Sequence, residues 1–466
     1  MLLAAASSVT LAGEASAQSA KQERPIPATP AESLTAIEHA FTLPKPPPLT
    51  LFPHLRERMA DQPAFLRDSK FDLDFRSYYR NEATAGPGAS PLKEAWAAGG
   101  SLSFETGRLF DVLSLGAVLY TSLPVYAPAA YGNTGLLLDT QQGYAALGQL
   151  YARARLFETH YLTVGRYYYD TPFLGPHDNR MSPNTFYGYS LMGTFGNTGD
   201  TTGDTSGNRA DGGGGPSFHY GIGWIGAIKP QDAIDFQGMA RAAGANADYG
   251  TAVLGGRLTW GRASIGAIEY YTQDTLNIFY TEAKYGLSPA PDVHLLGAVQ
   301  FAAQNSVGQS LLNGGASFAT NQLGAKVELG YDTAILTLGY SVVNPGFAIQ
   351  TPWSASPFYT DGQIQDFQRA GEQALMVGAS YVFKHIGLPG VAASVFYFNG
   401  WTAAPAAGLP LVETEWDFTL EWRPEWKPLD GLWFRARYGT NSVWQGGALA
   451  TTEELRLIAS YKVKLY

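Results

Sequence analysis

Residues 162–191, LTVGRYYYDTPFLGPHDNRMSPNTFYGYSL, decide the fold prediction. Apolar residues occupy alternate positions at the start, Leu162 and Val164, and alternation resumes from Phe186. Between them lie Thr171-Pro172 and a run rich in Gly, Pro, Asp and Asn, residues 175–184. A period of two indicates a strand with one apolar face, and Gly, Pro and Asn indicate turns. The stretch therefore predicts a strand, a long irregular loop and a second strand.

The same alternation recurs along the chain and predicts many strands. Residues 71–79 carry mainly apolar side chains at odd positions and polar ones at even positions, a pattern that faces lipid on one side and water on the other. The predicted strands are residues 70–80, 95–105, 111–122, 145–157, 160–168, 185–196, 216–228, 250–260, 262–272, 276–287, 292–304, 320–331, 333–342, 372–384, 390–400, 412–423, 431–440 and 453–465. Residues 233–243 fit a strand as well, and the family resemblance described below favours a loop there. An even number of strands suits a bacterial barrel with both termini on one side.

The composition excludes several classes of protein. The chain has 466 residues, of which 45% are apolar and 15% charged, with 53 Gly and 27 Tyr. Its mean hydropathy is −0.10, and no window of about 18 residues is continuously apolar, so no membrane helix is predicted. A net charge of −9 argues against a nucleic acid partner. The absence of Cys excludes disulfides, thiolate catalysis and Cys-bound zinc.

No catalytic, metal-binding or cofactor-binding pattern is found, so neither an enzyme nor a cofactor is predicted. The seven His residues are scattered, and no H-E-x-x-H, G-x-S-x-G or Walker A motif occurs. Residues 221–226 match G-x-G-x-x-G, but Lys229-Pro230 follows where a nucleotide site needs a helix. The Gly-rich stretch 196–215 contains Asp200, Asp204 and Asp211 without calcium-loop spacing, which favours a flexible loop.

Short motifs along the chain resemble those of the OprD family of outer-membrane porins. They are A-F-x-x-D-S at residues 64–69 with R-x-Y-Y at 76–79, the turn Asp178-Asn179-Arg180 between Pro172 and Pro183, P-W…G-E ending at Gly371-Glu372, and F-R-x-R at 434–437 followed by Arg456. The resemblance covers residues 64–466. It implies an all-β protein: an 18-stranded antiparallel transmembrane β-barrel of the Gram-negative outer membrane, with an inward-folded constriction loop.

The resemblance also implies a function, facilitated diffusion of small carboxylate-bearing nutrients through a narrow arginine-lined pore. In the family, arginines guide carboxylates, and the matching residues here are Arg180, with Asp178 in the same turn, and Arg435, Arg437 and Arg456. Alternation alone adds Arg153 and Arg155 to the predicted pore residues. Fixed cations offset the cost of moving a carboxylate through a narrow, low-dielectric pore. Arginine suits this role because its guanidinium binds carboxylates bidentately and stays charged.

A structural role is the alternative for Arg437, and a further set of charged residues is a candidate for substrate contact. If the last-but-one hairpin turn centres near residue 427, Asp417 lies opposite Arg437 and neutralises it. The acidic residues Asp361, Asp366 and Glu372 are candidates for contact with a substrate amine.

The segment before the predicted barrel divides in two. Residues 1–17 are interpreted as a signal peptide ending at Ala15-Ser16-Ala17. The first basic residue is Lys21, so either the signal starts upstream or the stretch is not a signal, and the first reading is favoured. Residues 18–63 are Pro-rich and are interpreted as a periplasmic N-terminal extension, either an extended tail or a contact for peptidoglycan. The alternative function is accordingly a loop-plugged barrel that anchors the cell wall.

The remaining expected partners are outer-membrane lipid and small anionic or zwitterionic solutes, with the protein a monomer or loose trimer. The terminal Tyr466 is out of phase with the lipid-facing positions of the last strand.

Overall fold

A computed structural model describes residues 48–465 except 88, 178, 197–214 and 403–409. The predicted signal peptide, residues 18–47, Asp178, most of the Gly-rich stretch and Tyr466 lie outside the described residues.

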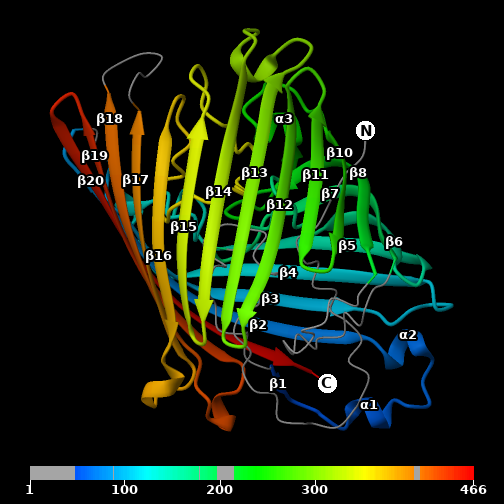
Figure 1. The fold of residues 1–466 in the computed structure, drawn as a ribbon. Coiled ribbons are helices and arrows are strands. Elements are labelled where there is room, and N and C mark those ends of the chain that lie inside the picture. Colours follow the sequence, from blue (N-terminus) through cyan, green and yellow to red (C-terminus); the bar gives the residue numbers. More distant parts are fainter. Residues whose placement is uncertain (1–47, 88, 178, 197–214, 403–409, 466) are drawn as a thin grey trace.

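The described chain is a single antiparallel β-barrel (Figure 1). Its 18 long strands are β2 (Lys70–Ala85), β3 (Lys93–Glu105), β4 (Leu113–Tyr126), β5 (Tyr144–Phe157), β6 (His160–Tyr167), β7 (Thr185–Gly196), β8 (Ser217–Lys229), β10 (Thr251–Trp260), β11 (Ala263–Thr272), β12 (Leu276–Ala290), β13 (Val293–Ser306), β14 (Ala319–Tyr331), β15 (Ala334–Val343), β16 (Gln373–Val382), β17 (Val391–Thr402), β18 (Leu411–Trp422), β19 (Leu432–Gln445) and β20 (Ala448–Lys464).

Strands that follow one another in the chain are neighbours in the barrel, and β2 pairs with β20 to join its two ends. The strand β10 lies alongside β8. The two-residue strand β9 (Gln237–Gly238) pairs with Ala227 and Ile228 at the end of β8. The short helix α3 (Met239–Ala242) follows β9. The prediction of an 18-stranded antiparallel barrel is confirmed, and residues 233–243 contribute no long strand.

The predicted strands end too early at one end of the barrel. There β2 continues to Ala85, β4 to Tyr126 and β19 to Gln445, and β20 begins at Ala448. In β2 the extension is NEATA, residues 81–85, whose small and polar residues on both faces leave no alternation of apolar side chains to mark it. This is also the end that carries the long connections, and we call it the long-loop end.

Apolar side chains cover the outer face of the barrel. Aromatic residues lie near the strand ends on this face, at the short-turn end Phe157, Trp260, Tyr285, Tyr331 and Trp422, and at the long-loop end Tyr126, Tyr187, Tyr271 and Trp444. Aromatic girdles of this kind mark the two interfaces of a membrane-spanning barrel. Within the described residues, no helix is long and apolar enough to cross a membrane.

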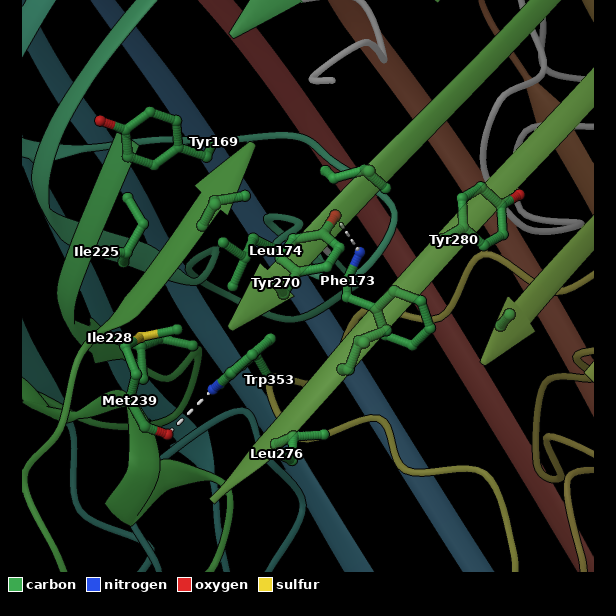
Figure 2. Packing of buried hydrophobic residues seen from close by; sticks show 14 of the residues in the cluster. Tyr169, Phe173, Leu174, Ile225, Ile228, Met239, Tyr270, Leu276, Tyr280 and Trp353 are labelled. Atoms are coloured by element: carbon green, nitrogen blue, oxygen red, sulfur yellow. Dashed lines mark hydrogen bonds between the residues drawn. The ribbon is translucent and has the colours of Figure 1, made fainter. Parts of the chain in front are cut away.

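The hydrophobic core lies inside the barrel and is built largely by two loops, residues 168–184 and 344–372. We call them loop 3 and loop 7. Both fold inward and pack against the strand wall from β8 to β12, as Figure 2 shows. Phe173 and Leu174 of loop 3 and Trp353 and Phe358 of loop 7 are at most 1% exposed. The predicted inward-folded constriction loop is therefore present, and a second loop joins it.

Residues 48–63 lie at the short-turn end, beside the C-terminus (Figure 1). The strand β1 (Leu49–Thr50) pairs in parallel with the end of β20, where Leu49 lies opposite Val463. Two short helices follow, α1 (Leu55–Arg58) and α2 (Ala64–Arg67). Val463 has the same parity as the apolar outward residues Leu455 and Leu457 of β20, but it is only 4% exposed because β1 runs alongside it.

Candidate functional site

One end of loop 3 is fixed by hydrogen bonds to the barrel wall. The Tyr270 hydroxyl on β11 donates to Thr171 Oγ1 at 2.8 Å and accepts from the Phe173 backbone N–H at 3.1 Å. Farther along the loop, Asn184 Nδ2 donates to the Trp353 carbonyl at 3.3 Å, and Trp353 Nε1 donates to the Met239 carbonyl at 3.1 Å. Loops 3 and 7 therefore share one set of anchors (Figure 2).

The segment of loop 3 around Arg180 and Met181 is fixed on a different wall. Met181 packs in a second buried cluster with Tyr78 of β2 and with Leu136 and Leu137, which lie in the loop between β4 and β5. The neighbouring carbonyl, that of Arg180, accepts a hydrogen bond from Arg76 Nη1. These contacts place Arg180 beside the wall formed by β2, β20 and β19.

Three arginines form a row across that wall. Arg80 on β2 lies directly opposite Arg456 on β20, and Arg456 lies directly opposite Arg437 on β19. All three side chains are at most 8% exposed. Like charges in directly opposed positions repel, so this row requires carboxylates nearby.

Glu454 is the carboxylate that joins the row. Arg80 Nε donates to Glu454 Oε1, and Arg456 Nε donates to Glu454 Oε2 at 2.8 Å. Arg80 has two further partners, the Glu82 carboxylate at 2.5 Å and the Thr134 carbonyl at 2.6 Å. Charge-assisted bonds of this kind hold the guanidinium planes in fixed directions.

The innermost part of loop 7 binds to the same wall through its backbone. Gln363 N–H donates to Asp417 Oδ2 at 2.8 Å, and Ile364 and Gln365 N–H donate to the two Glu415 oxygens at 2.7 and 3.0 Å. The Gln363 carbonyl accepts from Arg456 Nη2 at 2.9 Å. Carboxylates of β18 therefore position loop 7 beside the arginine row.

Arg180 differs from the arginines of the row. Within the described residues it has no ion pair, and its Nε is buried without a hydrogen-bond partner. Burial, with Arg80 and Arg456 adding to it, lowers the pKa of Arg180 from 12.5 to about 10, so the side chain stays charged at neutral pH. Gly135, at φ +70°, lets the neighbouring loop approach, because a Cβ there would lie 2.8 Å from Arg180 Nε.

The other predicted arginines lie apart from this group. Arg435 is paired with Glu421 Oε1 at 2.7 Å and stacks over Trp433, nearer the short-turn end. At the short-turn end of β5, Arg153 stacks over the Tyr161 ring with its Cζ 4.5 Å from the centroid. Arg155 Nη2 donates to the Asp111 carbonyl at 3.2 Å. The structure brings Arg180, Arg437 and Arg456 together and leaves the other three in separate positions.

The predicted register of the β18–β19 hairpin was wrong. Asp417 lies opposite Gly439, and the residue opposite Arg437 is Thr419. The hairpin centres one residue later than expected, which moves every cross-strand partner by two positions because the numbers of two paired residues add up to twice the centre. Asp417 still lies near enough to interact electrostatically with Arg437, while its Oδ2 is used by loop 7.

Two of the acidic residues of loop 7, Asp361 and Glu372, are buried, whereas Asp366 is exposed. The pKa of Asp361 lies well above its ordinary value because of burial and the neighbouring Asp366, and Asp361 Oδ1 accepts from Gln368 Nε2 at 2.9 Å. Burial raises the pKa of Glu372 to about 8, with Glu413 adding to the effect. Contact between these groups and a substrate amine stays a prediction.

Sequence reasoning missed Arg76, Arg80 and Glu454. All three residues have even numbers, whereas the apolar outward residues of the same strands have odd numbers. Alternation was therefore sufficient to place them on the inner face. It also missed a second charged group on the far wall, where Lys284 and Lys326 lie either side of Ala298 and pair with Glu282 and Glu328. No group of metal-ligating side chains occurs among the described residues.

Comparison with known proteins agrees with this architecture. The profile of the family described as "outer membrane porin, OprD family" matches residues 63–194 and 223–465. Similar solved structures include Pseudomonas aeruginosa OpdK with vanillate (22% identity, TM-score 0.72) and P. aeruginosa OccK9, also called OpdG (24% identity, TM-score 0.73). A BenF-like porin from Pseudomonas fluorescens Pf-5 is 19% identical with a TM-score of 0.71. Each alignment covers 86% of this chain and 100% of the other. No curated protein sequence matches the chain.

Proposed function

Because the chain belongs to the OprD family of outer membrane porins, we propose that it carries small carboxylate-bearing solutes across the outer membrane by facilitated diffusion, with Arg180 as the principal contact. The single observation that supports this proposal is the state of Arg180: a charged guanidinium close to those of Arg80 and Arg456, without an ion-pair partner among the described residues.

A carboxylate entering this site would replace water with guanidinium donors. The Arg180 guanidinium would donate hydrogen bonds to the two oxygens of one carboxylate. Arg80, Arg437 and Arg456 would add a positive electrostatic potential at the same wall. Their existing partners, above all Glu454, keep the attraction moderate. A moderate site lets the solute both enter and leave, which conduction requires. Arg435, Arg153 and Arg155 are proposed as weaker positions nearer the periplasmic, short-turn end.

The test is single-channel conductance of the refolded protein in planar bilayers. Wild type is compared with Arg180→Ala, which removes the charge, and Arg180→Lys, which keeps it without the bidentate fork. Vanillate is a suitable first anionic solute because the similar OpdK is described with it, and an amine of similar size is the cationic control. We expect vanillate to interrupt the wild-type current and its apparent affinity to fall about tenfold in Arg180→Ala, the size of one charge-assisted hydrogen bond.

Other outcomes would redirect the proposal. Equal vanillate affinity in wild type and Arg180→Ala would remove Arg180 from the transport path. A wild-type protein that conducts nothing would favour the loop-plugged anchor, because loops 3 and 7 both fold into the barrel. In that case, binding to isolated peptidoglycan should be lost on deletion of residues 18–63.

A further inference from the structure

Arg166 is a cation on the lipid-facing side of the barrel. It is the second-last residue of β6, at the long-loop end. Its cross-strand partners are Leu150 on β5 and Tyr187 on β7, each of which is 54% exposed on the outer face. In an outer membrane porin the long loops are extracellular, so Arg166 lies near the outer-leaflet interface.

Nothing in the described chain neutralises this charge. The Arg166 guanidinium lies over the Phe236 ring, with Cζ 4.7 Å from the centroid, and Nη1 donates to the Leu147 carbonyl at 3.2 Å. No carboxylate lies within ion-pair distance of it among the described residues, and most of its five N–H donors have no protein acceptor.

The lipid-facing carboxylates are treated differently. Glu94 accepts a hydrogen bond from the Tyr79 hydroxyl at 2.6 Å, and Glu453 accepts from the Tyr438 hydroxyl at 2.8 Å. Glu269 accepts from Asn277 Nδ2 at 2.6 Å. Each of these outward charges therefore has a donor on its own wall, whereas Arg166 directs donors into the surrounding medium.

A charged side chain on the lipid face of a barrel is costly, less so near an interface and least where an anion is available. The outer leaflet of a Gram-negative outer membrane supplies such anions, because its glycolipid carries phosphate groups at the interface. Arginine binds phosphate bidentately, and the Phe236 ring restricts the guanidinium to one orientation. The neighbouring apolar residues Leu147, Leu150 and Tyr187 are suited to the acyl region of the same lipid.

We propose that Arg166, oriented by Phe236, binds a phosphate group of the outer-leaflet glycolipid. This site is on the outside of the barrel and does not depend on the proposed solute path. Its failure and the failure of the transport proposal are therefore separate results.

The test measures binding of purified lipid A to the full-length protein in detergent, by native mass spectrometry and by the shift in unfolding temperature. Bisphosphorylated lipid A, enzymatically dephosphorylated lipid A and inorganic phosphate are compared. The variants are Arg166→Gln and Arg166→Lys, with Arg58→Gln as the matched control, because Arg58 is an exposed arginine at the opposite end of the molecule.

We expect Arg166→Gln to weaken binding of bisphosphorylated lipid A about tenfold, Arg166→Lys to weaken it less, and Arg58→Gln to leave it unchanged. Wild type should bind the dephosphorylated lipid as weakly as Arg166→Gln binds the bisphosphorylated lipid. Equal affinity in wild type and Arg166→Gln would overturn the proposal. Full competition by inorganic phosphate would assign the site to a free anion, and a change of oligomeric size in Arg166→Gln with unchanged lipid binding would assign the surface to contact between copies; either result overturns it too.

Discussion

Arg80 on β2 and Arg456 on β20 lie directly opposite each other where the first and last long strands of the barrel pair, and both donate to Glu454. Two like charges are thus held side by side at the closure of the barrel by one carboxylate. The arrangement combines stability with function, since the group that relieves the repulsion also limits how strongly the arginines attract a solute.

Replacing Glu454 by Gln should weaken the barrel and increase its preference for anions. The change removes a carboxylate that is only 1% exposed and leaves Arg80 and Arg456 opposed without it. Breaking a buried charge pair typically costs about 3–5 kcal/mol, and Glu82 will offset part of this. Unfolding in urea and the reversal potential in a salt gradient measure the two effects. Unchanged values of both would show that Glu454 is not needed to balance the row.

Glu415→Gln and Asp417→Asn should loosen the innermost part of loop 7. Each substitution weakens acceptors for backbone N–H groups of residues 363–365. We expect larger single-channel conductance and more current fluctuation in the double variant than in wild type. Glu421→Gln is the matched control, because Glu421 lies on the same strand face but pairs with Arg435 rather than with loop 7. An equal change in the control would indicate a general effect of charge on β18.

Tyr270→Phe should free one end of loop 3. The variant removes the donor to Thr171 and leaves the Phe173 N–H without its acceptor. A buried donor left unpaired costs about 1–3 kcal/mol. The neighbouring Tyr271→Phe is the control, since Tyr271 is 45% exposed on the outer face. The unfolding temperature, measured by the change in gel mobility on heating, should fall in Tyr270→Phe only. An equal fall in both variants would contradict a specific role for the Tyr270 hydroxyl.

The stability of loop 3 should fall as pH rises through about 6. Burial raises the pKa of Asp170 from 3.8 to about 6. A carboxyl group whose pKa is higher in the folded state stabilises that state fully below its unfolded pKa, and the contribution is lost as pH rises to the folded pKa. A shift of this size corresponds to at most about 3 kcal/mol.

Unfolding in urea between pH 3.5 and 7 checks this expectation. Wild type should lose stability over the range, and Asp170→Asn should lose less because its side chain does not ionise. Asp235→Asn, at an exposed loop position, should follow wild type. Parallel curves for wild type and Asp170→Asn would show that another group titrates.

The sequence by itself determined the barrel, the order of its long strands, and the inner or outer side of most residues, and the family resemblance settled the number of strands by assigning residues 233–243 to a loop. It could do so because each strand has one side toward lipid and the other toward the barrel interior. Apolar and polar residues therefore alternate along the strand, a local pattern with a period of two. The family motifs likewise pointed to Arg180, Arg437 and Arg456 before their positions in space were known.

The tertiary structure alone decided which charges meet. The hairpin register was missed by one residue at its centre, which sufficed to place Gly439 instead of Arg437 opposite Asp417. The closure of the barrel brought Arg80 to Arg456 across more than 370 residues of sequence, and loop 7 reached Glu415 and Asp417 through backbone groups that carry no sequence signal. Such contacts depend on strand register, barrel closure and loop docking, which are long-range properties that local patterns do not encode.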